Sequence, residues 1–235
     1  QVKILPDDID PMDCRYNVIQ WVHRSTRGWS YGGSVVDPRT GEIIKGHVSL
    51  GSLRIRQDFM IAQALMNNPY AASDRNDEPM LEMALARIRQ LSAHEVGHTL
   101  GFAHNFAAST NNRASVMDYP HPKIKVKNGK IDFSQAYDTG IGAWDKVSVA
   151  YSYSDIKDGM NEKKQLNTIL SHAQEQGLRF ITDSDARASG GAHIKAHLWD
   201  NVQTPDVELK EVLALRRIAI QNFSKDNIRT DEPYS

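Results

Sequence analysis

The segment from His94 to His104 constrains this chain more than any other, because it reads His-Glu-x-x-His-x-x-Gly-x-x-His. On a helix, His94 and His98 lie one turn apart on one face, so both imidazoles can reach one metal ion. Gly101 can adopt the left-handed conformation that ends a helix, and the turn would bring His104 back toward the same ion. Three histidine ligands leave a fourth position open, which is typical of catalytic zinc sites.

Glu95 lies next to the first of these histidines but points to a neighbouring position on the helix surface. It is therefore badly placed as a third ligand and well placed to accept a proton from a water that the metal activates. The alternative is a helix that carries its histidines by chance, and five fixed residues at these spacings argue against it. We predict a Zn²⁺ site with Glu95 as the general base.

The segment resembles the extended zinc signature of the metzincin metallopeptidases, which is followed by a methionine turn. Residues 115–119 read Ser-Val-Met-Asp-Tyr and match that turn. The resemblance implies that Met117 lies beneath the metal as an apolar floor. It also implies that Tyr119 approaches the metal and stabilises the transition state, as in the astacin-like and serralysin-like branches. Asn105, after the third histidine, is none of the Ser, Asp, Glu or Pro residues that sort the branches, so the resemblance is to the clan alone.

The resemblance implies a zinc-dependent endopeptidase that hydrolyses peptide bonds with a metal-activated water and Glu95 as general base. The implied fold is α+β, with a small twisted mixed sheet over a long zinc-binding helix and a mainly helical C-terminal subdomain. Residues 1–104 then form the N-terminal subdomain and residues 105–235 the C-terminal one, together one catalytic domain. Two alternatives stay open: a zinc-bearing module that binds peptides without turnover, and a zinc hydrolase acting on a non-peptide bond.

Composition narrows the expected partners of this 235-residue chain. A formal net charge of -1 gives no reason to expect nucleic acid or an anionic membrane surface, and no apolar run is long enough to span a bilayer. We therefore expect a protein or peptide substrate. Because Cys14 is the one cysteine in the sequence, no disulfide can form within the chain. Cys14 is most simply a small structural residue, and a thiol that switches the zinc site is the alternative.

The N-terminal residues 1–8 lack the basic start and apolar core of a signal peptide. Residues 16–52 also resemble bacterial metzincin-like domains found within larger exported proteins, and most of the clan is secreted. The resemblance thus implies an extracytoplasmic domain (secreted, periplasmic or at the cell surface) that belongs to a longer chain with other domains.

Strands are indicated at residues 16–23, 34–36 and 42–50 by their apolar and β-branched content. A proline- and glycine-containing turn at residues 37–41 joins the second and third strands as a hairpin. The resemblance implies that an edge strand runs antiparallel to the substrate, and chain order places this edge at about residues 33–36. An ordinary hairpin with no substrate role is the alternative.

Helical spacing indicates a helix at residues 53–66 and a second of about twenty-two residues that begins near Pro79 and ends in the zinc ligands. Met80 and Met83 near its start are expected to fill the core. The apolar stripe of the first helix is expected to comprise Ile55, Phe59, Ala62, Leu65 and Met66, and that of the second Leu81, Leu85, Ile88 and Leu91.

Four further elements are expected after the methionine turn: an exposed, lysine-rich hairpin arm at residues 123–130 and helices at residues 142–153, 162–176 and 206–223. His193 and His197 are spaced four apart, but no third ligand follows at zinc-site spacing, so a second metal is the weaker interpretation. Asp183 and Asp185 lack EF-hand spacing and are expected to be solvated loop carboxylates rather than calcium ligands.

Overall fold

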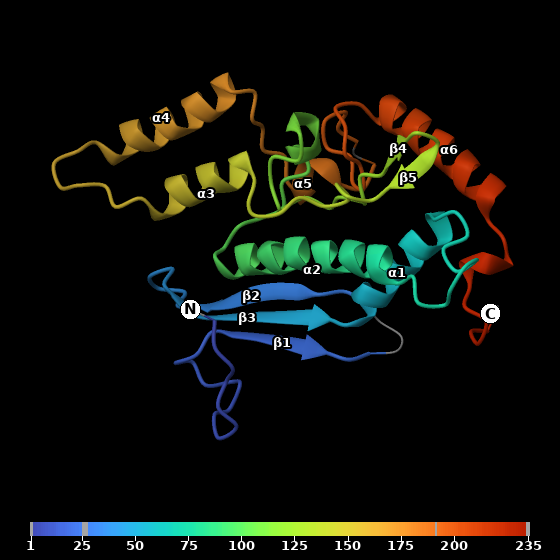
Figure 1. The fold of residues 1–235 in the computed structure, drawn as a ribbon. Coiled ribbons are helices and arrows are strands. Elements are labelled where there is room, and N and C mark those ends of the chain that lie inside the picture. Colours follow the sequence, from blue (N-terminus) through green and yellow to red (C-terminus); the bar gives the residue numbers. More distant parts are fainter. Residues whose placement is uncertain (1, 25–27, 191, 234–235) are drawn as a thin grey trace.

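The computed structural model describes residues 2–24, 28–190 and 192–233. In Figure 1 the long helix α2 (Glu78–Thr99) lies between two layers: a three-stranded sheet on one side and the C-terminal helices on the other. This arrangement confirms the predicted mixed α+β architecture with a small sheet over a long helix. Helix α2 is central because the sheet packs on one side of it and the C-terminal layer lies on the other. Side chains of α2 can therefore line the space between these two layers.

The sheet has the strand order β1-β3-β2. Strand β1 (Val18–Val22) is parallel to β3 (Ile43–Gly51), whereas β2 (Tyr31–Val36) is antiparallel to β3 and forms the predicted hairpin with it. Strand β2 is an edge strand, and it packs directly against α2. The backbone N–H and C=O groups on the side of β2 that points away from β3 therefore pair with no other strand of this sheet.

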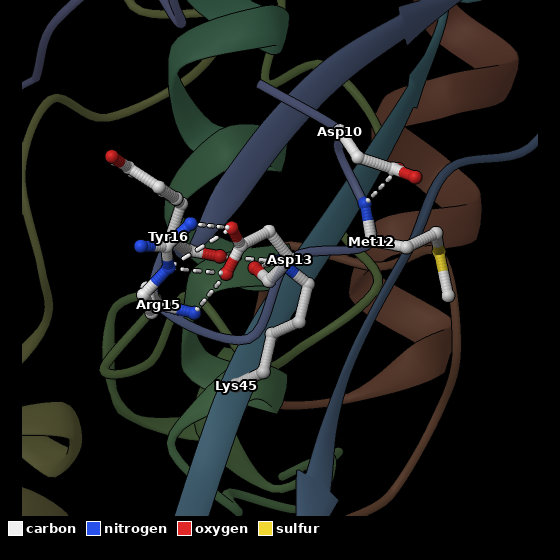
Figure 2. A network of polar contacts seen from close by, with 6 residues as sticks. All are labelled: Asp10, Met12, Asp13, Arg15, Tyr16 and Lys45. Atoms are coloured by element: carbon white, nitrogen blue, oxygen red, sulfur yellow. Dashed lines mark hydrogen bonds and ion pairs between the residues drawn. The ribbon is translucent and has the colours of Figure 1, made fainter. Parts of the chain in front are cut away.

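The described residues before β1 are irregular and are held on the sheet by Lys45 of β3. The Lys45 side chain is buried, and its ammonium group donates hydrogen bonds to the backbone carbonyls of Asp13 (3.0 Å) and Tyr16 (Figure 2). Cys14 is exposed, which is contrary to a packed structural role, because the chain here lies over the sheet rather than in the core.

Helix α1 (Leu53–Leu65) packs along α2 and, with it, encloses a hydrophobic cluster. Met80 and Met83 lie in this cluster and are almost fully buried, which confirms their predicted role as core residues. The cluster also contains Ala62, Tyr70, Ala136 and Tyr137, with Phe59, Met66, Ala86 and Phe133 packed against it.

The predicted apolar stripe of α2 is wrong near its start. Leu81 and Leu85 are 45% and 39% exposed, while Arg87 and Gln90 are buried. The buried face is rotated by about one residue from the hydrophobic pattern, because polar side chains occupy the part of the helix that faces the cleft and the methionine turn. Hydrophobicity alone cannot reveal a buried face of this kind.

The C-terminal half contains the elements that the sequence predicts. They are the two-stranded arm β4 (Lys125–Lys127) and β5 (Lys130–Asp132), and the helices α3 (Ala143–Tyr153), α4 (Glu162–Glu175) and α6 (Pro205–Asn222). The sequence did not predict the 3₁₀ turns η1 (Ala108–Asn111) and η2 (Lys225–Asn227) or the single-turn helix α5 (Asp183–Ala186). A second hydrophobic cluster, built on Ala108, Ala114, Ala173 and Leu178, joins this half together. The subdomain boundary after residue 104 stays a prediction.

Among the described helices, none combines the length and the apolar character needed to cross a bilayer.

Candidate metal centre and active-site cleft

Three histidines converge at the C-terminal end of α2. Nε2 of His98 lies 3.1 Å from Nε2 of His94 and 3.1 Å from Nε2 of His104. Gly101 has the predicted left-handed backbone conformation (φ +86°), and this turn folds the chain back so that His104 faces the helix it has just left. The structure thus brings together the three ligands that the sequence indicated.

The other nitrogen of each imidazole is hydrogen-bonded to an oxygen atom. Nδ1 of His94 lies 2.7 Å from the carbonyl oxygen of Val116, and Nδ1 of His98 lies 2.8 Å from that of Phe102. Because a carbonyl oxygen only accepts, each Nδ1 must carry the proton. The Nε2 lone pairs then all point at one place, which is how histidines bind a metal.

This donor set fits zinc. With Zn–N bonds of about 2.05 Å at tetrahedral angles, two ligand nitrogens lie about 3.3 Å apart, close to the separations observed here. Without a cation, three unprotonated nitrogens at this distance would face one another with no hydrogen between them. In the described part of the chain, these three residues form the only group of three or more potential ligands close enough to share an ion. His193 and His197 are both exposed and belong to no such group.

The third histidine has a partner that sequence reasoning missed. Nδ1 of His104 lies 2.7 Å from Oδ2 of Asp183, which comes from α5, 79 residues further along the chain. Asp183 was expected to be a solvated loop carboxylate; instead it pairs with a ligand, because the segment before α5 is hydrogen-bonded to the residues that follow His104. No local pattern marks this residue, since its partner is set by packing between distant segments.

Asn105 explains how that segment is held. Its side chain is fully buried, donates to the carbonyl of Arg179 (2.9 Å) and accepts from the backbone N–H of Ile181 (3.2 Å). The next residue, Phe106, donates its N–H to the carbonyl of Ile181 (2.8 Å). The residue after the third histidine, which distinguishes this chain from the familiar metzincin branches, therefore fixes the segment that leads into α5 and Asp183.

Glu95 is 3% exposed and lies between α2 and the edge strand. Burial raises the pKa of its carboxyl group to about 7, while the backbone N–H of Gly32 donates a hydrogen bond that opposes this rise. Gly32 is required here: a Cβ atom at this position would overlap the backbone carbonyl of Glu95. The strand and the helix thus approach as closely as their backbones permit at the residue predicted to be the general base.

Met117 packs beneath the helix between the first two histidines. A Cβ atom at Gly97 would overlap its sulfur, so the methionine fills the space that this glycine leaves. The turn is anchored by a buried carboxylate that the sequence did not indicate: Asp145 of α3 accepts from the Ser115 hydroxyl (2.5 Å) and from the Val116 N–H (2.9 Å).

Tyr119 lies beside the histidines, with its ring 4.6 Å from the ring of His104 and 5.6 Å from that of His94. Its other face stacks on Trp199 at 5.3 Å. Trp199 adopts a left-handed backbone conformation (φ 63°), which is unusual for a bulky residue, and its N–H donates to the carbonyl of Tyr119 (2.8 Å). No pattern in the sequence pointed to this tryptophan as a cleft residue.

These residues line a cleft of about 460 Å³ between α2 and the edge strand. The chain from Gly28 to Gly32 forms one wall, so the edge strand does reach the site, but by its first residues rather than by residues 33–36 as predicted. The close contact of Gly32 with the backbone of Glu95 places these first residues at the site. The cleft is lined by Gly28, Trp29, Ser30, Tyr31, Gly32, Arg54, Arg87, Leu91, His94, Glu95, His98, His104, Tyr119 and Trp199.

Comparison with known proteins supports the interpretation of this site. A family model described as Met-zincin matches residues 76–235, which include the histidine helix, the methionine turn and all later helices. Searches of curated proteins and of solved structures find no match. The family points to a zinc metallopeptidase-like function and to Zn²⁺ as the metal that the three histidines, which lie close enough together to share one ion, could bind. Because the match covers well over half of the chain, the protein belongs to the Met-zincin family.

Proposed function

We propose that this protein is a zinc-dependent endopeptidase, with His94, His98 and His104 as metal ligands and Glu95 as general base. The observation that carries the proposal is the convergence of three Nε2 atoms, each fixed through its Nδ1, at the floor of a cleft that also contains a buried glutamate. A site with a purely structural metal would be closed by a fourth protein ligand.

A zinc ion in this site would polarise the scissile carbonyl and make water a better nucleophile near neutral pH. Glu95 accepts the proton of the attacking water and delivers it to the leaving amine. Its pKa of about 7, raised by burial, suits both transfers, because a group titrating near the working pH can take up and release a proton readily. The hydroxyl of Tyr119 donates a hydrogen bond to the substrate oxygen on which negative charge develops in the transition state.

A peptide is the substrate that best fits the wall of the cleft. Strand β2 is an edge strand whose first residues line the site, so its outer backbone groups can pair with an extended chain. Main-chain pairing holds a peptide whatever its sequence and presents one bond to the metal. The resemblance to exported metzincin-like domains further supports a role outside the cytoplasm, as one part of a longer chain.

Replacing Glu95 by Gln tests the chemistry. The variant keeps the shape of the side chain but cannot accept a proton, so we expect zinc to be retained and kcat to fall by about 10²- to 10⁴-fold. Glu82→Gln, at an exposed position of the same helix, is the matched control and should behave as wild type. A Glu95→Gln variant that cleaves at a near wild-type rate would remove this residue from the mechanism.

A mixed peptide library, incubated with and without a chelator and read by mass spectrometry, tests the reaction class. Internal cleavage that the chelator abolishes is the expected result. Stoichiometric zinc with no cleavage of any peptide would instead favour a binding module, and turnover of only non-peptide esters or amides would favour another zinc hydrolase.

A further inference from the structure

Two arginines line the cleft beside the metal ligands. Arg87 precedes His94 by seven residues on α2, or about 10 Å along the helix axis, and Leu91 lies between them on the same face. Arg54 of α1 lines the same part of the cleft. Arg54, Arg87 and Leu91 are called the arginine pocket below.

Arg87 is 5% exposed, yet it forms no ion pair with a carboxylate in the described part of the chain. Its Nη1 donates to the side-chain oxygen of Gln90, and its guanidinium lies 5.4 Å from the ring centre of Tyr137. Its Nε is buried and has no hydrogen-bond partner. A buried guanidinium without a counter-ion is costly, so its presence beside a cleft calls for an acceptor that arrives from outside.

Two carboxylates lie near enough to attract Arg87, those of Asp58 and the general base Glu95, and neither forms an ion pair with it among the described residues. Asp58 is already committed. Asp58 accepts two hydrogen bonds from Arg54 (2.6 and 2.8 Å) and a third from the hydroxyl of Tyr137 (3.1 Å). Asp58 is therefore saturated by Arg54 and Tyr137, and Arg87 is left without a direct carboxylate partner at this end of the cleft.

We propose that the arginine pocket binds the carboxylate of an acidic substrate residue, so that this enzyme prefers peptides with Glu or Asp next to the scissile bond. The proposal rests on the endopeptidase function proposed above. A carboxylate from the substrate would accept hydrogen bonds from the guanidinium of Arg87, which lines the cleft and has no ion pair of its own among the described residues. The flanking Leu91 would cover the methylene groups of the same side chain, and glutamate has the longer reach of the two acids.

The direct test uses the unaltered zinc-loaded protein and peptides that differ in one residue. At each of the two positions that flank the cleaved bond, Glu is compared with its neutral isostere Gln. We expect kcat/KM to be about 10- to 100-fold higher for Glu at one of these positions, as for a charge-assisted hydrogen bond. Equal or faster cleavage of the Gln peptides at both positions would overturn the proposal and leave the endopeptidase function intact.

A binding measurement separates the two proposals if nothing is cleaved. Peptide hydroxamates, which hold zinc through their hydroxamate group, are prepared in Glu and Gln versions and titrated into the zinc-loaded protein by calorimetry. At least tenfold tighter binding of the Glu version supports the arginine pocket even without turnover. Equal affinity of the two versions, with the side chain placed on either side of the hydroxamate, argues against it.

The variant Arg87→Met identifies the residue responsible. Arg87 also contacts Gln90, which supports the methionine turn through the carbonyl of Val116 (3.0 Å), so a loss of overall activity alone would be uninformative. The readout is therefore the ratio of Glu to Gln kcat/KM. We expect Arg87→Met to bring this ratio close to one, while Arg89→Met, at an exposed position of the same helix, keeps the wild-type ratio. If Arg87→Met keeps the wild-type ratio of Glu to Gln kcat/KM, the assignment is refuted. It is also refuted if the ratio falls close to one in the control Arg89→Met.

Discussion

The contact between Gly32 and Glu95 allows a sharp test of how the edge strand supports the site. A Cβ atom on residue 32 would overlap the carbonyl oxygen of Glu95 and lie 2.7 Å from its carbonyl carbon and 3.0 Å from its Cα. Ordinary contact begins at 3.4 Å, so a Gly32→Ala variant must move the strand and the helix apart by at least 0.7 Å. Both partners are backbone atoms, so no side chain can rotate away to relieve the overlap.

Two effects follow from this displacement. Forced overpacking of a well-packed site costs about 1–3 kcal/mol of stability. The shift also weakens the hydrogen bond from the Gly32 N–H to the Glu95 carboxylate, which removes an interaction that lowers the pKa of the general base. Because a misplacement of about 1 Å near a reacting group can cost about 100-fold in rate, we expect kcat to fall by about one to two orders of magnitude.

Gly33→Ala is the matched control, because a Cβ atom there would meet no atom within 4 Å. Alanine is the better strand residue by about 0.5–1 kcal/mol, so Gly33→Ala should equal or slightly exceed the wild type in stability. Urea unfolding gives the stability of both variants, and peptide turnover with zinc content gives their activity. If both variants lose stability and activity equally, the close approach of strand and helix is not what positions Glu95.

Three further predictions concern the metal site. Asp183→Asn should weaken zinc binding by about 10- to 100-fold, measured in competition with a chromophoric chelator, whereas Asp185→Asn at an exposed neighbouring position should not. Equal zinc affinities of the two variants would show that the Asp183 carboxylate does not support His104 as a ligand. Gly97→Ala should destabilise the protein by about 1–3 kcal/mol although alanine favours helices, because its Cβ would overlap Met117; a stability gain on urea unfolding would contradict this packing. Burial lowers the pKa of His94 from 6.5 to about 3, so between these values the unfolded chain binds a proton that the folded protein does not. The free energy of unfolding of the metal-free protein should therefore fall as pH drops below about 6.5, by up to about 1.4 kcal/mol per pH unit, and a His94→Gln variant should show a shallower slope.

The sequence determined the features that depend on short-range spacing. His94 and His98 share a helix face because they lie four residues apart, and Gly101 ends the helix because glycine tolerates a positive φ. The strands and helices were predictable for the same reason, since hydrophobic period, proline and glycine act within a few residues. The family match supports this interpretation over residues 76–235.

Tertiary structure alone decided which remote side chains complete the site. Asp183, Asp145 and Trp199 reach the site from segments that no local pattern connects to it, and Arg87 is buried although a hydrophobic pattern would place it outside. Which remote residues reach the site depends on how distant segments pack against each other. The close contact of Gly32 with Glu95 depends on such packing as well. The spacing of the metal ligands is a property of one short segment of sequence. The side chains that orient these ligands, and those proposed to contact the substrate, are brought into place only when the layers pack together.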